Sequence, residues 1–284
     1  MSAAGSRSER GALATITPEQ VLGALALAES GEVIELGVPL GPATPVPAHR
    51  HGVLRFMNRD GGDYAAGAKR PDGFQFAEDT VVLPTHIGTH VDALAHVWHD
   101  DHLYDGSPQA ATRSNSGATR CGAEKLGPIV ARGVLLDAAA SRPPERGAAI
   151  GSEDLERAAA AAEVEVEPGD VVLVRTGWLG RKGDDAAAYY EGEPGLDRGS
   201  AAWLAERGVA MVGADNFAIE QIPFPTDRVF PVHQLLIADH GIPLLEGVAL
   251  DELARRRPGA FLFVALPLPL VGCTASPLSP VAIL

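Results

Sequence analysis

The chain has 284 residues, 46% of them hydrophobic, and its 23 basic and 37 acidic residues give a net charge of −14. This length and hydrophobic content allow a sizeable buried core and exclude a largely disordered protein. Proteins that bind nucleic acid usually carry a basic surface, so the acidic balance predicts no nucleic-acid partner.

Neither end of the sequence has the pattern of a signal peptide or a membrane helix. The first ten residues, MSAAGSRSER, contain no apolar segment, and the longest uncharged stretch, 258–284, carries five prolines. Signal peptides need an apolar segment, and membrane helices do not tolerate that many prolines. Cys121 and Cys273 are too far apart for a paired metal motif and are interpreted as reduced thiols. We therefore expect a cytoplasmic protein without membrane contact.

The chain is expected to form one folded unit. Residues 1–12 are predicted to be a flexible N-terminal tail, and no repeat or strong linker divides residues 13–284. The first helix is expected to begin at Thr17, with Thr as N-cap, proline next and glutamine at the third position, and to end near Gly31. A short strand over 33–36 should follow.

Residues 42–79 show no clear periodicity and are rich in glycine, proline and charge. Loops of this length in compact domains are usually functional, so this segment is predicted to be an irregular loop that serves the site. The run 81–83 after it is expected to be a short strand that leads into Pro84.

Apolar runs and helical patterns alternate over the rest of the chain, which favours a mixed α/β fold. The segment 258–284 is expected to be one buried strand followed by an irregular tail. No GxGxxG, GxxxxGK[ST] or GxSxG motif is present, which excludes the usual dinucleotide, phosphate-loop and serine-hydrolase signatures. The predicted strands are 129–136, 170–175, 209–212 and 260–266, and the predicted helices are 152–162 with Ser152 as N-cap, 200–207, 232–240 and 250–257.

The most informative stretch is PTHIGTHVD, residues 84–92. His86, His90 and Asp92 share even spacing, and alternate residues of an extended chain face the same side. Gly88 between them leaves room for a metal or a substrate. Two imidazoles and a carboxylate are a suitable ligand set for a catalytic zinc or manganese ion, which would acidify a bound water and polarise a carbonyl. His96, four residues after Asp92, is a candidate general base and acid.

This stretch resembles the HxGTHxDxxxH motif of the metal-dependent cyclase family, which includes kynurenine formamidase and isatin hydrolase. His233-Gln-Leu-Leu, followed by Gly241-Ile and Glu246, is similar to a later family segment. The resemblance implies an α/β fold of swivelling β/β/α type, a single domain with a small barrel-like mixed sheet flanked by helices. It also implies a site with His86, His90 and Asp92 as metal ligands and His96 as the catalytic histidine.

The resemblance leaves the number of metals open. In formamidase-like members, the later histidine and glutamate complete a two-metal site with a bridging aspartate. Here His233 and Glu246 are thirteen positions apart, one more than expected for that subgroup, and the long segment 42–79 leans toward the isatin-hydrolase branch. His233 and Glu246 are predicted either to bind metal or to orient a ligand.

Three further residues are predicted to contact substrate. Arg59 in the polar segment before the motif could polarise an oxygen or pair with a carboxylate. Phe76 could line an apolar pocket, with packing in the core as the alternative. Asp215 follows a predicted strand, where sites often collect residues, but a turn or capping role is equally compatible with its position.

We therefore predict a metal-dependent hydrolase that cleaves a carbon–nitrogen bond in a small cyclic or N-formyl amide. A lactone hydrolase, a dehydratase and a ring-closing cyclase are alternatives, because the Lewis acidity of the metal serves all of them. A non-catalytic metal-binding module is a third hypothesis. Family members are commonly oligomeric, so a homo-oligomer (dimer or tetramer) is expected, with the apolar C-terminal tail as a candidate interface.

Overall fold

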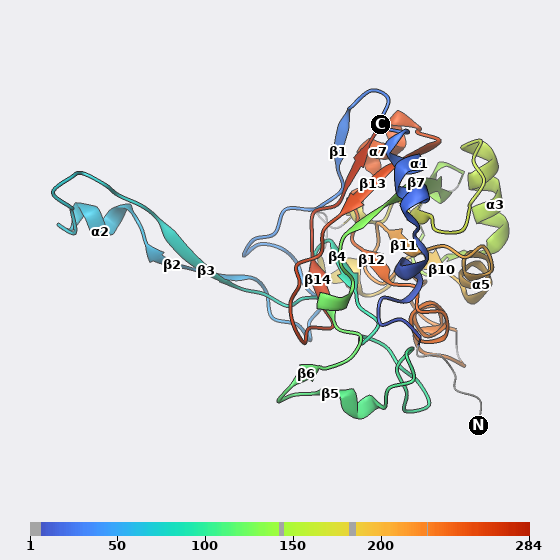
Figure 1. The fold of residues 1–284 in the computed structure, drawn as a ribbon, viewed down its shortest axis with the longest axis horizontal. Coiled ribbons are helices and arrows are strands. Elements are labelled where there is room, and N and C mark those ends of the chain that lie inside the picture. Colours follow the sequence, from blue (N-terminus) through green and yellow to red (C-terminus); the bar gives the residue numbers. More distant parts are fainter. Residues whose placement is uncertain (1–6, 142–144, 182–185, 226) are drawn as a thin grey trace.

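The computed structural model describes residues 7–141, 145–181, 186–225 and 227–284. A curled nine-stranded sheet forms its centre (Figure 1). Across the sheet the strands are β1 (Val33–Glu35), β15 (Val281–Ile283), β13 (Ala260–Ala265), β7 (Ile129–Asp137), β9 (Val171–Arg175), β11 (Met211–Ala214), β12 (Leu244–Glu246), β4 (His90–Asp92) and β14 (Ala275–Pro277). The predicted mixed α/β single domain with a curled, barrel-like sheet is confirmed.

The middle of the sheet is parallel and both of its faces are covered. Strands β7, β9, β11 and β12 pair in parallel, and the outer strands pair antiparallel. Parallel strands are usually buried on both faces and are therefore continuously apolar, as β9 is. Val172 and Val174 of β9 join one hydrophobic core, and Val171 and Leu173 join the other. The sheet thus separates two cores.

Helices cover the two faces. Residues of α3, α5 and the π-helix η6 enter the core on one face, and residues of η1 and α7 enter the other. No helix in the described part of the chain has the length and apolar character needed to cross a membrane. The helices are α1 (Pro18–Leu25), α2 (Gly61–Ala65), α3 (Ser152–Ala161), α4 (Ala186–Tyr190), α5 (Arg198–Glu206), α6 (Pro231–His233), η6 (Gln234–Asp239) and α7 (Asp251–Arg256), with 3-10 turns η1 (Gly11–Thr15), η2 (Gln109–Ala111), η3 (Ala123–Lys125), η4 (Ala138–Ala140) and η5 (Leu179–Arg181).

The predicted helix starts are mostly confirmed. The Thr17 hydroxyl accepts a hydrogen bond from the Gln20 N–H, and the Gln20 side chain accepts one from the Thr17 N–H, so the capping box is present. The helix ends at Leu25, six residues before the expected stop at Gly31. The N-cap of α3 is Gly151, and Ser152 is the first residue of the helix. The Gly151 N–H donates to the Asp154 carboxylate.

The predicted loop 42–79 is the largest error of the sequence analysis. Strands β2 (Leu54–Arg59) and β3 (Glu78–Val82) form an antiparallel hairpin, with α2 near its tip. Figure 1 shows this hairpin projecting away from the body of the molecule. Its strands are exposed along nearly their whole length. Because neither face is buried against the body, the alternation of apolar and polar residues that marks most strands is absent.

The C-terminal segment is also more regular than expected. Strand β14 pairs with β4, and β15 pairs with both β1 and β13, so the tail completes the sheet. Pro277 fits because β14 lies at the edge of the sheet, where a missing N–H removes no ladder bond. Besides the hairpin of β2 and β3, two pairs of two-residue strands in the described residues lie outside the main sheet: β5 (Thr112–Arg113) with β6 (Gly117–Ala118), and β8 (Ala149–Ile150) with β10 (Gly195–Leu196).

Candidate metal centre

Strand β4 places two of the predicted ligands in the interior. It lies between β12 and β14, with His90 opposite Glu246 and Asp92 opposite Leu244. This register brings the Glu246 carboxylate to the His90 imidazole, with 3.2 Å between Oε2 and Nε2. His90 Nε2 is also 3.6 Å from Asp92 Oδ1. The sheet pairing therefore joins the early motif to Glu246, which lies far along the chain.

His86 reaches the same place by a turn, which corrects the expected extended geometry. Only residues 90–92 of the motif are a strand, and Gly88 has φ +56°. A Cβ on Gly88 would lie 2.4 Å from the Leu40 side chain. The glycine is therefore required by its backbone angle and by Leu40, not by space for a metal. The turn brings His86 Nδ1 to 2.7 Å from Asp92 Oδ1.

Two more histidines approach the other oxygen of Asp92. His96 follows a turn in which its N–H donates to the Ala93 carbonyl, and its Nε2 is 3.7 Å from Asp92 Oδ2. His233 stands where α6 passes into the π-helix η6, and its Nε2 is 3.7 Å from Asp92 Oδ2 and 3.3 Å from Glu246 Oε1. π-helical turns are often found at functional sites.

Asp92 is the centre of the arrangement. Two groups of ligand atoms, each within 4.8 Å, share it: His86, Asp92 and His96, and His90, Asp92 and Glu246. His90 Nε2 and both Asp92 oxygens are buried without a hydrogen-bond partner of proper geometry. Buried polar atoms nearly always have a partner. Nitrogen and oxygen donors that converge without satisfying one another fit a cation between them.

Hydrogen bonds fix the rings of two of these histidines. His90 Nδ1 is 3.0 Å from the Gly88 carbonyl, so Nδ1–H donates and the lone pair of Nε2 points at Asp92 and Glu246. His233 Nδ1 lies 2.6 Å from Glu220, which also accepts the N–H groups of Val232 and His233. A carboxylate or carbonyl behind the imidazole is the usual support of a metal-binding histidine.

Burial divides the cluster. His90, Asp92, His233 and Glu246 are buried, whereas the side chains of His86 and His96 are 13% and 29% exposed. Although its edge is exposed, most of the His96 imidazole is shielded from water by the residues around it, and this desolvation lowers its pKa to about 4, so the ring is neutral at physiological pH. Burial works against ionisation of Asp92, but the surrounding histidines hold the pKa of its carboxyl well below the usual range. The cluster therefore opens on the side of His86 and His96.

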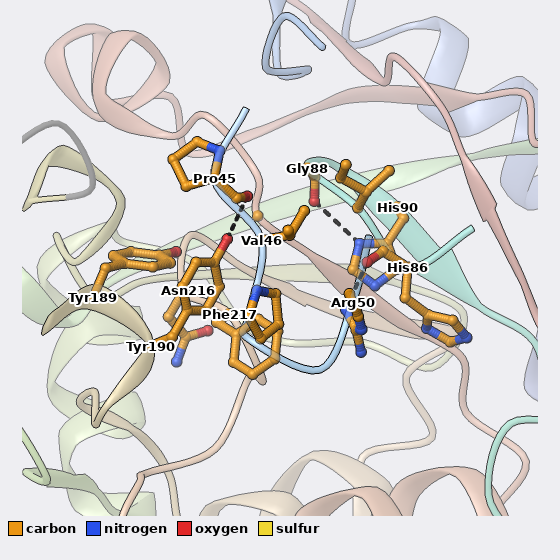
Figure 2. Close-up of a pocket in the computed structure, with 13 residues that line it drawn as sticks. Pro45, Val46, Arg50, His86, Gly88, His90, Tyr189, Tyr190, Asn216 and Phe217 are labelled. Atoms are coloured by element: carbon orange, nitrogen blue, oxygen red, sulfur yellow. Dashed lines mark hydrogen bonds between the residues drawn. The ribbon is translucent and has the colours of Figure 1, made fainter. Parts of the chain in front are cut away.

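A pocket beside the cluster is built by residues that the sequence analysis missed. Arg50 donates to the His86 carbonyl at 2.6 Å and lies 5.4 Å from the ring centroid of Phe217. The Tyr190 hydroxyl donates to the Pro45 carbonyl, and the amide oxygen of Asn216 is buried without a partner. Figure 2 shows these side chains around His86 and His90. They come from three separate segments, so no local motif could identify them.

The three predicted substrate contacts do not line this pocket. Arg59 and Phe76 belong to the projecting hairpin, where the guanidinium lies 5.3 Å from the Phe76 ring centroid. Asp215 is buried, but its carboxylate accepts hydrogen bonds from the N–H and hydroxyl of Thr176 and from the Gly177 N–H. It therefore anchors the turn after β9.

Comparison with known proteins gives the same assignment as the motif. The family model described as putative cyclase matches residues 34–221, which include the histidine cluster from His86 to His96. The chain belongs to the cyclase family. A cyclase-family crystal structure, described as a novel cyclase, aligns with a TM-score of 0.91 and 33% identity over 99% of this chain and 96% of that one.

Named relatives of this cyclase-family chain are hydrolases. Kynurenine formamidase of Salinibacter ruber is 31% identical over 195 residues, 69% of this chain and 74% of the relative. Isatin hydrolase of Roseibium aggregatum is 27% identical over 92% of this chain and 95% of the relative. Isatin hydrolase A from Ralstonia solanacearum aligns with a TM-score of 0.67 and 25% identity over 94% of this chain and 98% of that one. The chain is thus an enzyme of this family.

Proposed function

We propose that the chain hydrolyses a carbon–nitrogen bond in a small cyclic or N-formyl amide, with a divalent metal held at Asp92. The observation that carries the proposal is the convergence of buried imidazole and carboxylate atoms on Asp92 without mutual hydrogen bonds. The names of the relatives, a formamidase and isatin hydrolases, support an amide as the substrate.

The donor set suits zinc or manganese, because both accept imidazole and carboxylate ligands. We assign His86, His90 and Asp92 as ligands. Glu246 and His233 are further ligands, since Glu246 shares a ligand group with His90 and His233 Nε2 lies 3.3 Å from Glu246. When bound, the metal would polarise the substrate carbonyl and lower the pKa of water.

His96 is the proton carrier of the proposed reaction. Its side chain stands on the open side of the cluster, where a substrate can reach it, and it lies 4.2 Å from the His86 ring between centroids. Hydrolysis forms a carbon–oxygen bond from water and breaks the carbon–nitrogen bond. His96 takes the proton released by the water and delivers it to the leaving nitrogen.

The test pairs activity with metal content. His96→Ala should lower turnover of cyclic or N-formyl amides by roughly 10²–10⁴-fold while elemental analysis finds the metal content of the wild type. His99→Ala, three residues further on and on the surface, is the matched control and should keep both. Loss of metal from His96→Ala would make His96 a ligand. A metal-loaded wild type that turns over no amide would contradict the proposal.

Product mass separates hydrolysis from dehydration and from ring closure. Hydrolysis of an amide or a lactone adds one water, dehydration removes one, and ring closure by isomerisation leaves the mass unchanged.

We also propose that the enzyme is a homo-oligomer, a dimer or a tetramer. The cytoplasmic location expected from the sequence stays a prediction.

A further inference from the structure

Residues 54–82, called the arm below, are the part of the molecule that the proposed function leaves unexplained. Strands β2 and β3 pair with each other and with no other described strand. Within the arm, only Tyr64 is buried, beneath the turn that its hydroxyl makes with the backbone of Phe76. Isolated two-stranded hairpins are marginally stable in water, so an arm of this kind needs a surface to rest on.

The inner half of the arm exposes apolar side chains on both faces, with Met57 and Val81 on one face and a cluster of three on the other. Leu54 pairs with Val82 across the hairpin, and Phe56 lies two residues further along the same face. Leu54 is 50% exposed, Val82 is 53% exposed and Phe56 is 54% exposed. Long exposed strands with apolar side chains invite pairing with another chain. The face has the character of an interface that is uncovered in one chain.

We infer that the arm packs against a second copy of this chain and carries Arg59 and Phe76 to the metal centre of that copy. Charge favours this partner: the arm has four basic and five acidic residues, so nearly all of the net charge of −14 lies on the rest of the chain. A near-neutral arm meets little repulsion from an acidic body. The outer part of the arm, residues 59–76, has three basic and three acidic residues, so it offers no net positive charge to an anionic membrane surface.

The root of the arm lies at the pocket. The chain enters the arm from residues 45–50, four of which line the pocket, and returns from it to His86. In a two-fold dimer each arm contacts the partner in the same way, so antiparallel arms place each tip beside the root of the other. The arm, whose strand β2 spans about 20 Å, therefore brings its tip to the open side of the partner's site.

The outer part of the arm is built to present a fixed group. The Arg59 guanidinium lies over the rings of Phe76 and Tyr64, at 5.3 Å and 6.0 Å from their centroids. A guanidinium held on an aromatic surface suits a planar substrate with a carbonyl or carboxylate oxygen. This role of Arg59 and Phe76 rests on the proposed function, whereas the dimer itself does not.

The dimer is tested by light scattering. Wild type should have about twice the chain mass of 29.6 kDa, or a higher even multiple, and the double variant Phe56→Asp with Val82→Asp should fall to the mass of one chain. Leu22→Asp changes a 67% exposed apolar residue on α1 and should leave the mass unchanged. A monomeric wild type, or an oligomer that the double variant does not weaken, would overturn the inference whether or not the chain is a hydrolase.

The crossing of the arm is tested by mixing two inactive chains. The double variant Arg59→Ala with Phe76→Ala should keep its mass and metal but lose most turnover, and His96→Ala is inactive for its own reason. Subunit exchange in an equal mixture should restore about a quarter of wild-type turnover, because each hybrid dimer has one site with both His96 and an intact partner arm. Absence of recovery in hybrids whose formation is shown by mass would refute the crossing.

Discussion

The metal centre and the arm are neighbours in the chain but differ in what they lack. The arm ends at Val82 and the centre begins at His86. At the centre, polar atoms are buried without hydrogen-bond partners. On the arm, apolar side chains are exposed without a core. Both departures from a satisfied fold have a cost; the first is the basis of the proposed cation in the interior, and the second is the basis of the proposed interface on the arm.

The consequence is that the two regions should respond to mutation in different ways. At the centre, the two oxygens of one carboxylate, that of Asp92, share the contacts to four histidines, so one substitution affects the whole site. On the arm, side chains contact mainly each other, so a single substitution should disturb association or substrate contact and leave the body folded.

The largest effect is expected for Asp92→Asn. Asp92 is fully buried and belongs to both ligand groups, and asparagine keeps its size but removes its charge. Elemental analysis should find little metal, and turnover should fall by more than about a thousandfold, since Lewis-acid stabilisation is worth several kcal/mol. Asp100→Asn, whose side chain is 96% exposed nearby, is the control. Full metal content in Asp92→Asn would show that the centre does not depend on the shared carboxylate.

The next effect contrasts the stability of the body with that of the arm. Phe263→Ala empties a fully buried position in β13 and should lower the free energy of unfolding by about 3–5 kcal/mol. Phe74→Ala removes a ring that is 55% exposed on the arm and should change it by less than about 0.5 kcal/mol. Urea denaturation followed by circular dichroism measures both. Similar losses would mean that the arm is part of the cooperative core.

A smaller effect is expected for Glu220, whose carboxylate holds the His233 ring. Glu220→Gln leaves an acceptor for the backbone but weakens the bond that holds the His233 ring. Substitutions at such supporting positions typically lower metal affinity by about 10–100-fold. Competition with a chelator measures this affinity, and Glu191→Gln on the surface serves as the control. Unchanged affinity would remove His233 from the set of ligands, whereas unfolding would appear in circular dichroism.

Local patterns predicted what local sequence determines. The strand over 170–175 was found because a continuous apolar run is what a strand buried on both faces requires. The histidine motif was found because its residues lie within eleven positions. The extended geometry assigned to His86 was wrong because a positive φ at Gly88, imposed by the approach of Leu40, turns the chain there.

Long-range placement could not be predicted in the same way. Glu246 faces His90 only because β12 pairs with β4, and Glu220 reaches His233 across the fold. Asp215 looked like a site residue by its position after a strand, but Thr176 and Gly177 occupy its carboxylate. Most of the arm was missed because its strands face solvent on both sides and carry no regular alternation of apolar and polar residues; only the run 81–83, at the end of β3, was recognised.

The smallest effect concerns Cys121, which lies under the centre. Its carbonyl accepts the Ala95 N–H at 2.9 Å, and its thiol is buried, whereas Cys273 is partly exposed. Burial raises the pKa of Cys121 from 9.0 to about 12, so the folded chain favours the neutral thiol. The resulting stabilisation is complete below pH 9 and is lost as the pH rises toward 12.

Thiol titration at pH 8 should therefore detect one reactive cysteine per native chain, Cys273, and both cysteines in urea. Reaction of both thiols at equal rates in the native protein would mean that the segment beneath His96 opens readily. In that case the contrast between a closed centre and an open arm would fail, and the exposure of His96 would reflect local unfolding.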